Sequence, residues 1–562
     1  MTLLGQKETA KLPARPPAFF ALPGNAFAFA VALAVAAWLA LLLQGLPVAD
    51  MDDWDRLLMA HDIAWGPLLK SFFRPWSTSI HWTGQVDRYN ELYSKRVFLT
   101  VVQKAIEQFW GMQSFPHYFL KSLFFAGTST LFFVFLRRVT RSLPFALGGT
   151  FFFVLVPAHY PHLMWLMDAI TLVHCLIMAA LVFAFPILKS FDRRDPAWKP
   201  FLARLAAFAA LGFAAMKTKE PALSLPLALG LYTVLRLFDW KDQKGKLALW
   251  LAVLAFLIFL DVPVLHLFDA GQQHFHFRPE RVLRFLWRNY GCGYQDETSP
   301  ALFSLQYVWP VSVARTFGFA FLWLLIFSGA AAFLRRGKIA AEKPGLPVLF
   351  FACWALGEIP FMIFFEPDPR YFSGMMIPLT VLAVLLFQKA WQGMAPGAPR
   401  KIFAAVLCAA LAWTLVLDLK SILWLRLQIG QRVHRLYHTA DTIYRDRYPD
   451  IPFRLRDLAL YYCSDYVLNH PRLEQDTFFV GMGYEDWNRL GPNAGTIEDF
   501  ERFAKQGYVY YANDIPDPFR GDPRVKELAA LSGVNEGSAL ERLIYAVKKK
   551  PAPFFIYKWV GA

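Results

Sequence analysis

The sequence predicts an α-helical polytopic membrane protein with about eleven transmembrane helices and a small extracytoplasmic α/β domain at its C-terminal end. The 562-residue chain is 56% hydrophobic and only 18% charged, whereas soluble domains carry about 25% charged residues. Its apolar residues gather into runs that approach the roughly 20 residues needed to cross a bilayer. Its basic residues gather between alternate runs. This composition excludes a disordered chain and argues against a purely soluble enzyme.

Eleven apolar runs account for the predicted spans. They cover residues 26–48, 117–136, 143–158, 168–188, 201–216, 219–238, 247–268, 309–334, 346–365, 371–390 and 402–425. A water-soluble core of reasonable size cannot bury so many runs. The first run is too long for a secretory signal and lacks a clear small-residue cleavage site, so we interpret it as an uncleaved span.

The distribution of Lys and Arg predicts the orientation of the chain. One set of alternate segments is more than twice as dense in Lys and Arg as the opposite set, with the tail left out. Basic loops stay in the cytoplasm, so we expect a bacterial inner-membrane protein with a cytoplasmic N-terminus and a periplasmic C-terminus. The basic set comprises residues 1–25, 137–142, 189–200, 236–246, 335–345 and 389–401. Because this set carries the entire formal charge of +15, we expect no nucleic-acid partner.

Four regions follow from this topology. Residues 1–25 form a cytoplasmic N-terminus and residues 26–425 form the membrane domain. Within the membrane domain, the first outer loop (49–116) contains an amphipathic stretch at 91–110 that suits the membrane interface. Residues 426–562 form the outer domain, with a helical start at 432–447 and apolar stretches at 476–480 and 508–511.

Polar side chains cluster at the outer ends of the predicted spans, where charge at membrane depth usually serves function. These are Asp50, Asp52, Asp53 and Asp55; Arg74; His159, His162 and Asp168; Lys217, Lys219 and Glu220; and Glu366, Asp368, Arg370 and Tyr371. Each group has an ordinary structural explanation, such as a helix cap, a snorkelling cation or an interfacial anchor. Their shared side of the membrane indicates one site.

These residue types suit transfer of a group from a lipid phosphate. Of two adjacent carboxylates, Asp52 and Asp53, one can act as a general base while the other orients it or binds a metal. Arg and Lys can bind a lipid-borne phosphate and stabilise the negative charge that grows on it as its bond breaks. Asp52, Asp53, His159 and His162 could supply metal ligands, but we expect neither a metal nor another cofactor.

Five ordered motifs resemble the GT-C superfamily of glycosyltransferases that use lipid-phosphate sugars, in particular the group of protein O-mannosyltransferases and the aminoarabinose transferase. The motifs are Asp52-Asp53-Trp54; Phe73-Arg74-Pro75-Trp76; Phe115-Pro116-His117-Tyr118 through Arg138 with Leu155-Val156-Pro157-Ala158-His159-Tyr160 and Trp165; Lys217-Thr218-Lys219-Glu220-Pro221-Ala222; and Pro369-Arg370-Tyr371 followed by Pro378. The resemblance covers roughly residues 26–390. Two features depart from the pattern. The second acid is Asp53, where the group often has Glu, and residues 426–562 lack the tetratricopeptide periodicity found in the related transmembrane O-mannosyltransferases with repeat tails.

The resemblance implies an extracytoplasmic site, a polyprenyl-phosphate sugar donor and a hexosyl or pentosyl transfer to a protein, lipid or glycan. It implies that Asp52 or Asp53 is the base. It implies donor or phosphate contacts from Arg74, Lys219 and Arg370. From their place in the outer cluster we add Lys217 and Tyr371 to these contacts, with Trp54, His159, His162, Asp168 and Glu220 in support.

Two other functions stay open from the sequence. A transporter or flippase would suit eleven spans, although transporters usually place polar residues near the bilayer midplane and often contain internal repeats. A polysaccharide polymerase or ligase would use pyrophosphate-linked donors on the same face. The sequence names neither the sugar nor the acceptor. It also leaves open whether Cys292 and Cys463, both expected outside, form a disulfide.

Overall fold

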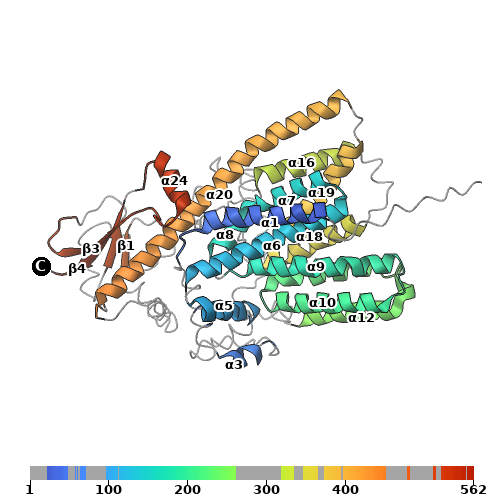
Figure 1. Ribbon diagram of the computed structural model, residues 1–562, viewed down its shortest axis with the longest axis horizontal. Helices are drawn as coiled ribbons and strands as arrows, with labels where there is room; N and C mark the ends of the chain where they lie inside the picture. The colour runs from blue at the N-terminus through green and yellow to red at the C-terminus, as the bar shows by residue number, and fades with distance from the viewer. Residues whose placement is uncertain are drawn as a thin grey trace, which may run out of the picture.

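The computed structural model describes residues 22–47, 64–70, 97–111, 113–166, 168–260, 318–334, 346–364, 373–393, 397–447, 477–480, 510–513, 520–551 and 553–561, with isolated positions at 57, 60, 72, 449 and 450. In these ranges the chain forms a bundle of helices and, beyond one end of it, a small sheet (Figure 1). The bundle contains α1 (Leu22–Leu43), α6 (Ser114–Thr140), α7 (Leu143–Val154), α9 (Ile170–Asp192), α10 (Trp198–Met216), α11 (Ser224–Arg236), α12 (Lys244–Phe259), α16 (Phe319–Leu334), α18 (Leu346–Phe364), α19 (Met376–Gly393) and α20 (Ala398–Arg447). Short helices α3 (Trp65–Lys70) and α5 (Val97–Trp110) flank it.

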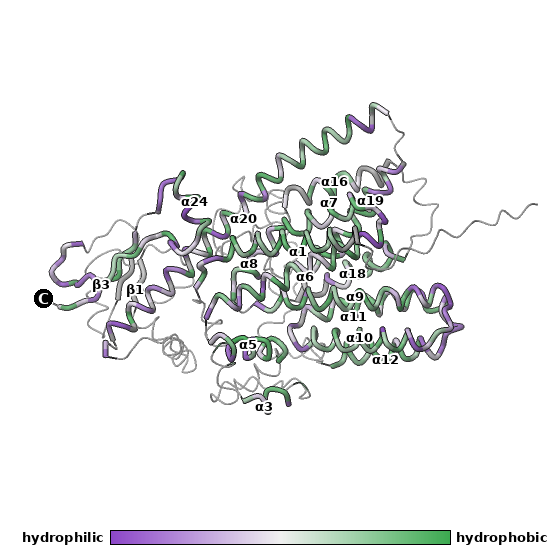
Figure 2. The backbone as a smooth tube through the Cα atoms, viewed as in Figure 1, coloured by the Kyte–Doolittle hydropathy of each residue, from purple (hydrophilic) through white to green (hydrophobic). Residues whose placement is uncertain are grey.

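Each predicted apolar run overlaps one of these helices. Figure 2 shows hydrophobic residues along the bundle helices and hydrophilic residues at the turns. Within the described residues, five helices are long and apolar enough to cross a membrane, or up to seven if each of two bent pairs counts as one span. The protein therefore has several membrane-capable helices, while the total of eleven crossings stays a prediction.

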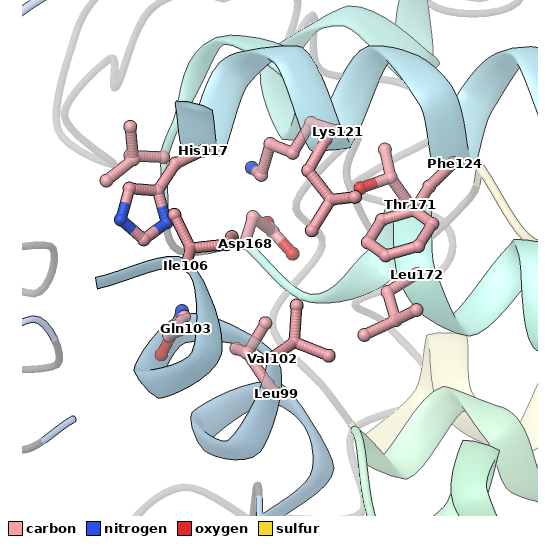
Figure 3. A pocket seen from close by; sticks show the side chains of 12 residues that line it. Leu99, Val102, Gln103, Ile106, His117, Lys121, Phe124, Asp168, Thr171 and Leu172 are labelled. Atoms are coloured by element: carbon pink, nitrogen blue, oxygen red, sulfur yellow. The ribbon is translucent and has the colours of Figure 1, made fainter. Parts of the chain in front are cut away.

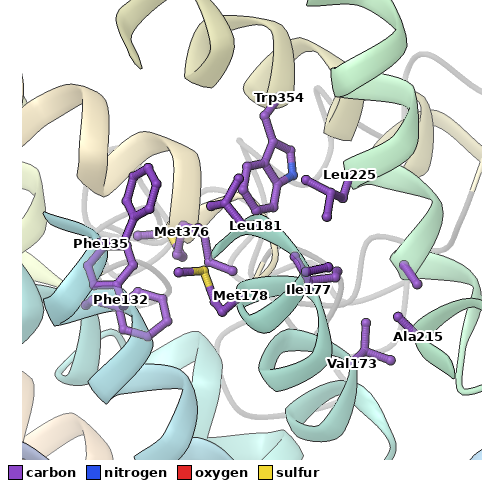
Figure 4. Packing of buried hydrophobic residues seen from close by; sticks show 14 of the residues in the cluster. Phe132, Phe135, Val173, Ile177, Met178, Leu181, Ala215, Leu225, Trp354 and Met376 are labelled. Atoms are coloured by element: carbon purple, nitrogen blue, oxygen red, sulfur yellow. The ribbon is translucent and has the colours of Figure 1, made fainter. Parts of the chain in front are cut away.

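The bundle core is built by close packing of large side chains. Phe132 and Phe135 of α6 lie near Met178 of α9, with Trp354 of α18 and Met376 of α19 in the same cluster (Figure 4). Because lipid is as apolar as these side chains, packing and not the hydrophobic effect holds membrane helices together.

Gly149 shows how tight this packing is. A Cβ atom built on this residue of α7 would lie 2.7 Å from Cδ1 of Leu136 and 2.8 Å from Cγ2 of Val384. Glycine therefore lets α7 approach α6 and α19 closely.

The run at 143–158 is a bent segment, not one straight span. α7 ends at Val154, and the chain continues through η2 (Pro157–His159) into α8 (Tyr160–Met164) at an angle of 57°. Pro157 and Pro161 lie in the first turns of η2 and α8. Because proline has no backbone N–H to donate, it is tolerated at a helix start and does not continue the preceding helix. The bend places α8, which contains His162, at the bundle end that faces the sheet (Figure 1).

α20 is one continuous helix of 50 residues. It passes without a break through residues 425 and 426, where we expected the membrane domain to end, and reaches the sheet (Figure 1). The strands are β1 (Thr477–Val480), β2 (Tyr510–Asn513), β3 (Val525–Leu531) and β4 (Phe554–Trp559). They run in the order β1-β2-β4-β3, with β1 parallel to β2 and the other pairs antiparallel. β1 and part of β2 lie within the two apolar stretches noted in the tail.

A buried ion pair joins the sheet region to the bundle. Nη1 of Arg426 in α20 lies 2.7 Å from Oε1 of Glu541 in α24 (Ala539–Val547), and neither side chain is exposed. Arg426 also donates from Nε to the carbonyl oxygen of Leu42 at 2.5 Å and from Nη2 to that of Gln44 at 3.2 Å. The other oxygen of Glu541 accepts a bond from the backbone N–H of Asn535 at 2.9 Å. One ion pair therefore fixes the C-terminal end of α1 against α20 and α24.

Replacing Gly45 with Ala should lower the thermal stability of the protein. Gly45 has φ = +77°, and an added Cβ would lie 2.8 Å from the backbone carbon of Gly537. The left-handed conformation alone costs Ala about 1–2 kcal/mol. The measurement is the thermal unfolding midpoint in detergent micelles. Gly148→Ala, which has open space at its Cβ inside α7, is the matched control and should not lower the midpoint. Equal midpoints for both variants would contradict the close contact at Gly45.

Candidate active site

The carboxylate of Asp168 is the centre of a buried polar cluster at this end of the bundle. Its Oδ2 lies 2.7 Å from Nδ1 of His162, and its Oδ1 lies 3.3 Å from Nζ of Lys219. Oδ1 also accepts a bond from the backbone N–H of Ile170 at 3.0 Å, at the start of α9. The side chains of His162, Asp168 and Lys219 are 1%, 4% and 7% exposed. Asp168 therefore joins the bent segment after α7 to the turn after α10.

His162 extends the cluster toward α19. Its Nε2 lies 3.1 Å from Oγ of Ser373, just before α19 begins. With its proton on Nδ1, directed at the Asp168 carboxylate, the imidazole accepts a bond from the Ser373 hydroxyl. A carboxylate behind a histidine fixes its tautomer and ring orientation in this way. The linked residues are, in order, Lys219, Asp168, His162 and Ser373. They come from the turn after α10, the segment between α7 and α9, and the turn before α19.

Side chains of α6 hold the segment that carries His162 and Asp168. The Lys121 ammonium donates to the carbonyl oxygen of His162 at 2.6 Å and to that of Trp165. The Tyr118 hydroxyl donates to the carbonyl oxygen of Met164 at 3.0 Å. These bonds satisfy carbonyl groups that the broken helix leaves open.

Lys217 and Lys219 share the short turn between α10 and η3 (Glu220–Leu223). Both side chains are buried. The backbone carbonyl of Lys217 accepts a bond from the N–H of Phe98, at the start of α5, at 3.0 Å. α5 is therefore attached directly to the turn that carries both lysines.

A pocket lies beside Asp168, between α5 and the bundle. Figure 3 shows Asp168, His117 and Lys121 on the bundle side and Leu99, Val102, Gln103 and Ile106 of α5 on the other. Phe124, Leu120, Leu166, Thr171 and Leu172 complete the lining. Among the lining residues, His117 is 4% exposed, and its Nε2 has no hydrogen-bond partner within the described part of the chain. The lining of this small pocket therefore mixes polar and apolar side chains.

The structure brings together three of the residues singled out in the sequence, namely His162, Asp168 and Lys219, and places Lys217 in the same turn as Lys219. His159 takes no part in the hydrogen bonds that link Lys219, Asp168, His162 and Ser373. Its ring packs 4.5 Å from Phe153 and 5.4 Å from Phe125, measured between ring centroids. This packing is that of a core histidine.

The other expected site residues fall outside the part of the chain that the structure describes. They are Asp52, Asp53, Trp54, Arg74, Arg370 and Tyr371, and the same holds for Cys292 and Cys463. Glu220 begins η3, but its side chain is outside the described set. Among the described residues, no three His, Cys, Asp or Glu side chains are grouped so that they could hold a metal ion. With the acidic pair outside those ranges, the expectation of no metal stays a prediction.

Sequence reasoning missed Lys121, Ser373 and Glu358. Glu358 of α18 is buried, and its carboxylate accepts a bond from Nε1 of Trp354 at 3.0 Å. A Cβ built on Gly374 would lie 3.2 Å from Oε1 of Glu358, so this acid packs under the turn that carries Ser373. The sequence could have pointed to Lys121 and Glu358, because each is an isolated charge inside an apolar run, where charged residues usually serve a function. Ser373 gave no such signal.

Of three comparisons with known proteins, only that with solved structures gives matches. No family model matches the chain, and no curated protein matches it. Among solved structures, one match is the crystal structure of ArnT from Cupriavidus metallidurans bound to undecaprenyl phosphate. The match covers 96% of this chain and 98% of that one, with 15% identity and a TM-score of 0.41. A similarity of this size says nothing about the substrate or the acting residues, which have to be inferred from this chain.

Proposed function

We propose that this protein is a glycosyltransferase of the GT-C type that moves a sugar from a polyprenyl-phosphate donor to an acceptor at the periplasmic face of the inner membrane. The observation that carries the proposal is the buried Lys219–Asp168–His162–Ser373 cluster. It forms at one end of the bundle, from segments that carry or adjoin the ordered motifs.

The charge of this region supports a phosphate ligand. Three buried lysines, Lys121, Lys217 and Lys219, lie at or next to the cluster. The lysine ammonium is a compact point charge that suits a phosphate group. The small pocket beside Asp168 adds a partly apolar surface next to the cluster.

The proposed reaction divides the work between two groups of residues. Asp52 or Asp53 takes the proton from the acceptor group as its atom bonds to the anomeric carbon. The bond between that carbon and the phosphate oxygen breaks, and polyprenyl phosphate leaves with the bonding electrons. Lys219, with Arg74 and Arg370, stabilises the charge that grows on this phosphate. Asp168 and His162 hold Lys219 and the α19 turn in position.

A transfer assay with purified protein tests the acidic pair. Asp52→Asn and Asp53→Asn should differ, and the variant that lacks the base should lose about 10²- to 10⁴-fold in kcat. Proteoliposomes with a polyprenyl-phosphate sugar donor provide the measurement, with the lipid product identified by mass spectrometry. Asp239→Asn is the matched control, because this aspartate is 58% exposed in the turn between α11 and α12, at the opposite end of the bundle.

Three results would count against the proposal. Undiminished transfer in both aspartate variants would remove the acidic pair from catalysis. Consumption of a pyrophosphate-linked donor would favour a polymerase or ligase. Movement of the intact donor across the bilayer without transfer would favour a flippase.

A further inference from the structure

One face of α24 is apolar and exposed, while the opposite face is fixed to the bundle. Glu541 and Tyr545 lie one turn apart on the fixed face. Glu541 pairs with Arg426, and the Tyr545 hydroxyl accepts a bond from Nε2 of Gln431 at 2.8 Å. Leu543 and Val547 point away from them and are 68% and 91% exposed. In a helix, residues two positions apart lie roughly on opposite sides, so the two faces are separate.

The exposed face lies near an apolar stripe on α20, a helix long and apolar enough to cross a membrane. On α20, Ile402, Val406, Trp413, Val416 and Trp424 are exposed large apolar residues, spaced so that they share one side of the helix. Trp424 is the last of them along the chain, and Nζ of Lys548, just after α24, lies 5.4 Å from the centroid of its ring. Aromatic residues at the end of an apolar stripe mark the boundary between lipid and water. α24 therefore lies at that boundary.

The orientation and charge of α24 fit this position. In Figure 1, α24 lies across the direction of the bundle helices, beside the end of α1. Three exposed lysines, Lys548, Lys549 and Lys550, follow it directly. A short helix parallel to the membrane, apolar on one face and followed by basic residues, has the composition of an interfacial helix on anionic lipid.

We propose that α24 inserts Leu543 and Val547 into the adjoining membrane leaflet and that Lys548–Lys550 bind anionic headgroups there. This contact holds the small sheet at the membrane surface. It does not depend on the proposed transfer reaction, and it leaves the junction at Arg426 and Glu541 in place.

Quenching of a fluorescent label tests the contact. Leu543→Cys and Val547→Cys would each carry an environment-sensitive label, in a background in which Cys408 and the other accessible cysteines are serine. Lys526→Cys, exposed on β3 of the same sheet region, is the matched control. The full-length protein is placed in vesicles of phosphatidylcholine with or without phosphatidylglycerol. Spin-labelled lipid should quench the labels at 543 and 547 at least about twofold more than the label at 526, as expected for an inserted helix face. Iodide in the water should show the reverse order.

The basic residues have their own test. Changing Lys548–Lys550 to glutamine should remove the increase in lipid quenching that phosphatidylglycerol causes. Two results would overturn the proposal. The first is equal iodide quenching at 543 and 526 without lipid quenching, which would place the face in water. The second is protection of 543 from both quenchers, which would mean that protein covers it, either a second copy or another partner.

Discussion

Asp168→Asn should nearly abolish sugar transfer. The substitution keeps the shape of the side chain but removes its charge, so Lys219 loses its partner 3.3 Å away at a site where both side chains are buried. Removing one partner of a buried ion pair costs about 3–5 kcal/mol. The new amide can also donate to Nδ1 of His162, which would reverse the tautomer and its bond with Ser373. We expect a loss of at least about 10²-fold in kcat, because losing one group that stabilises the developing charge has about this effect and Lys219 would no longer be held in position.

A comparison of variants separates catalysis from folding. Asp168→Glu keeps the charge and should recover part of the activity, whereas Asp168→Asn should not. Ser373→Ala removes only the far end of the cluster and should lower kcat less than Asp168→Asn does. The readouts are steady-state transfer kinetics and the thermal unfolding midpoint of each variant. Wild-type kcat in folded Asp168→Asn would refute the proposed role of the cluster.

Glu541→Gln should strongly destabilise the protein. It leaves the guanidinium of Arg426 fully buried without this counter-charge, which costs about 3–5 kcal/mol. Arg426 would then also hold the carbonyl groups of Leu42 and Gln44 less firmly, so the end of α1 should loosen. The expected result is a marked fall in the thermal unfolding midpoint in micelles.

Two further variants identify the cause. Arg426→Met combined with Glu541→Leu removes both charges, but it also removes the bonds to the carbonyl oxygens of Leu42 and Gln44 and from the N–H of Asn535. Because buried backbone groups without partners are costly, this double variant should destabilise the protein at least as much as Glu541→Gln. Gly430→Ala should mimic the loss, since its Cβ would collide with the guanidinium of Arg426. If Glu541→Gln matches the wild type while the double variant unfolds, the pair is not what holds the junction.

Hydropathy was enough to locate the bundle helices. A segment in lipid must satisfy its backbone hydrogen bonds within a helix, and its side chains must be mostly apolar. The runs at 117–136 and 168–188 correspond to α6 and α9 within a few residues. The amphipathic stretch at 91–110 contains α5. The sequence indicated a span at 402–425 and a separate helical stretch at 432–447, and it did not predict that both belong to one unbroken helix, α20. The polar half of α20 makes contacts such as the bond from Gln431 to Tyr545, which hydropathy does not reveal.

The candidate site was only partly visible in the sequence. Charged residues at span ends drew attention to His162, Asp168 and Lys219, because such charges are costly in a membrane. Their mutual pairing depends on the bend after α7 and on Lys121, which holds that bend from a distant helix. Ser373 joins through its hydrogen bond to His162, and no pattern in its own segment marks it. Contacts of this kind arise from tertiary packing, and the spacing of apolar residues in the sequence does not reveal them.

The junction at Arg426 has a consequence for how the protein is made. Gln44, near the start of the chain, leaves the ribosome long before Glu541, which completes the ion pair close to the other end. Because synthesis adds about 5–20 amino acids per second, the end of the first helix waits roughly half a minute or more for its counterpart. During this time water or lipid headgroups must satisfy the carbonyl groups that Arg426 later binds. α1 can pack against α6 early in synthesis, but the junction at its C-terminal end is completed only when Glu541 is made. A chain truncated before residue 541 would therefore leave the end of α1 without this ion pair.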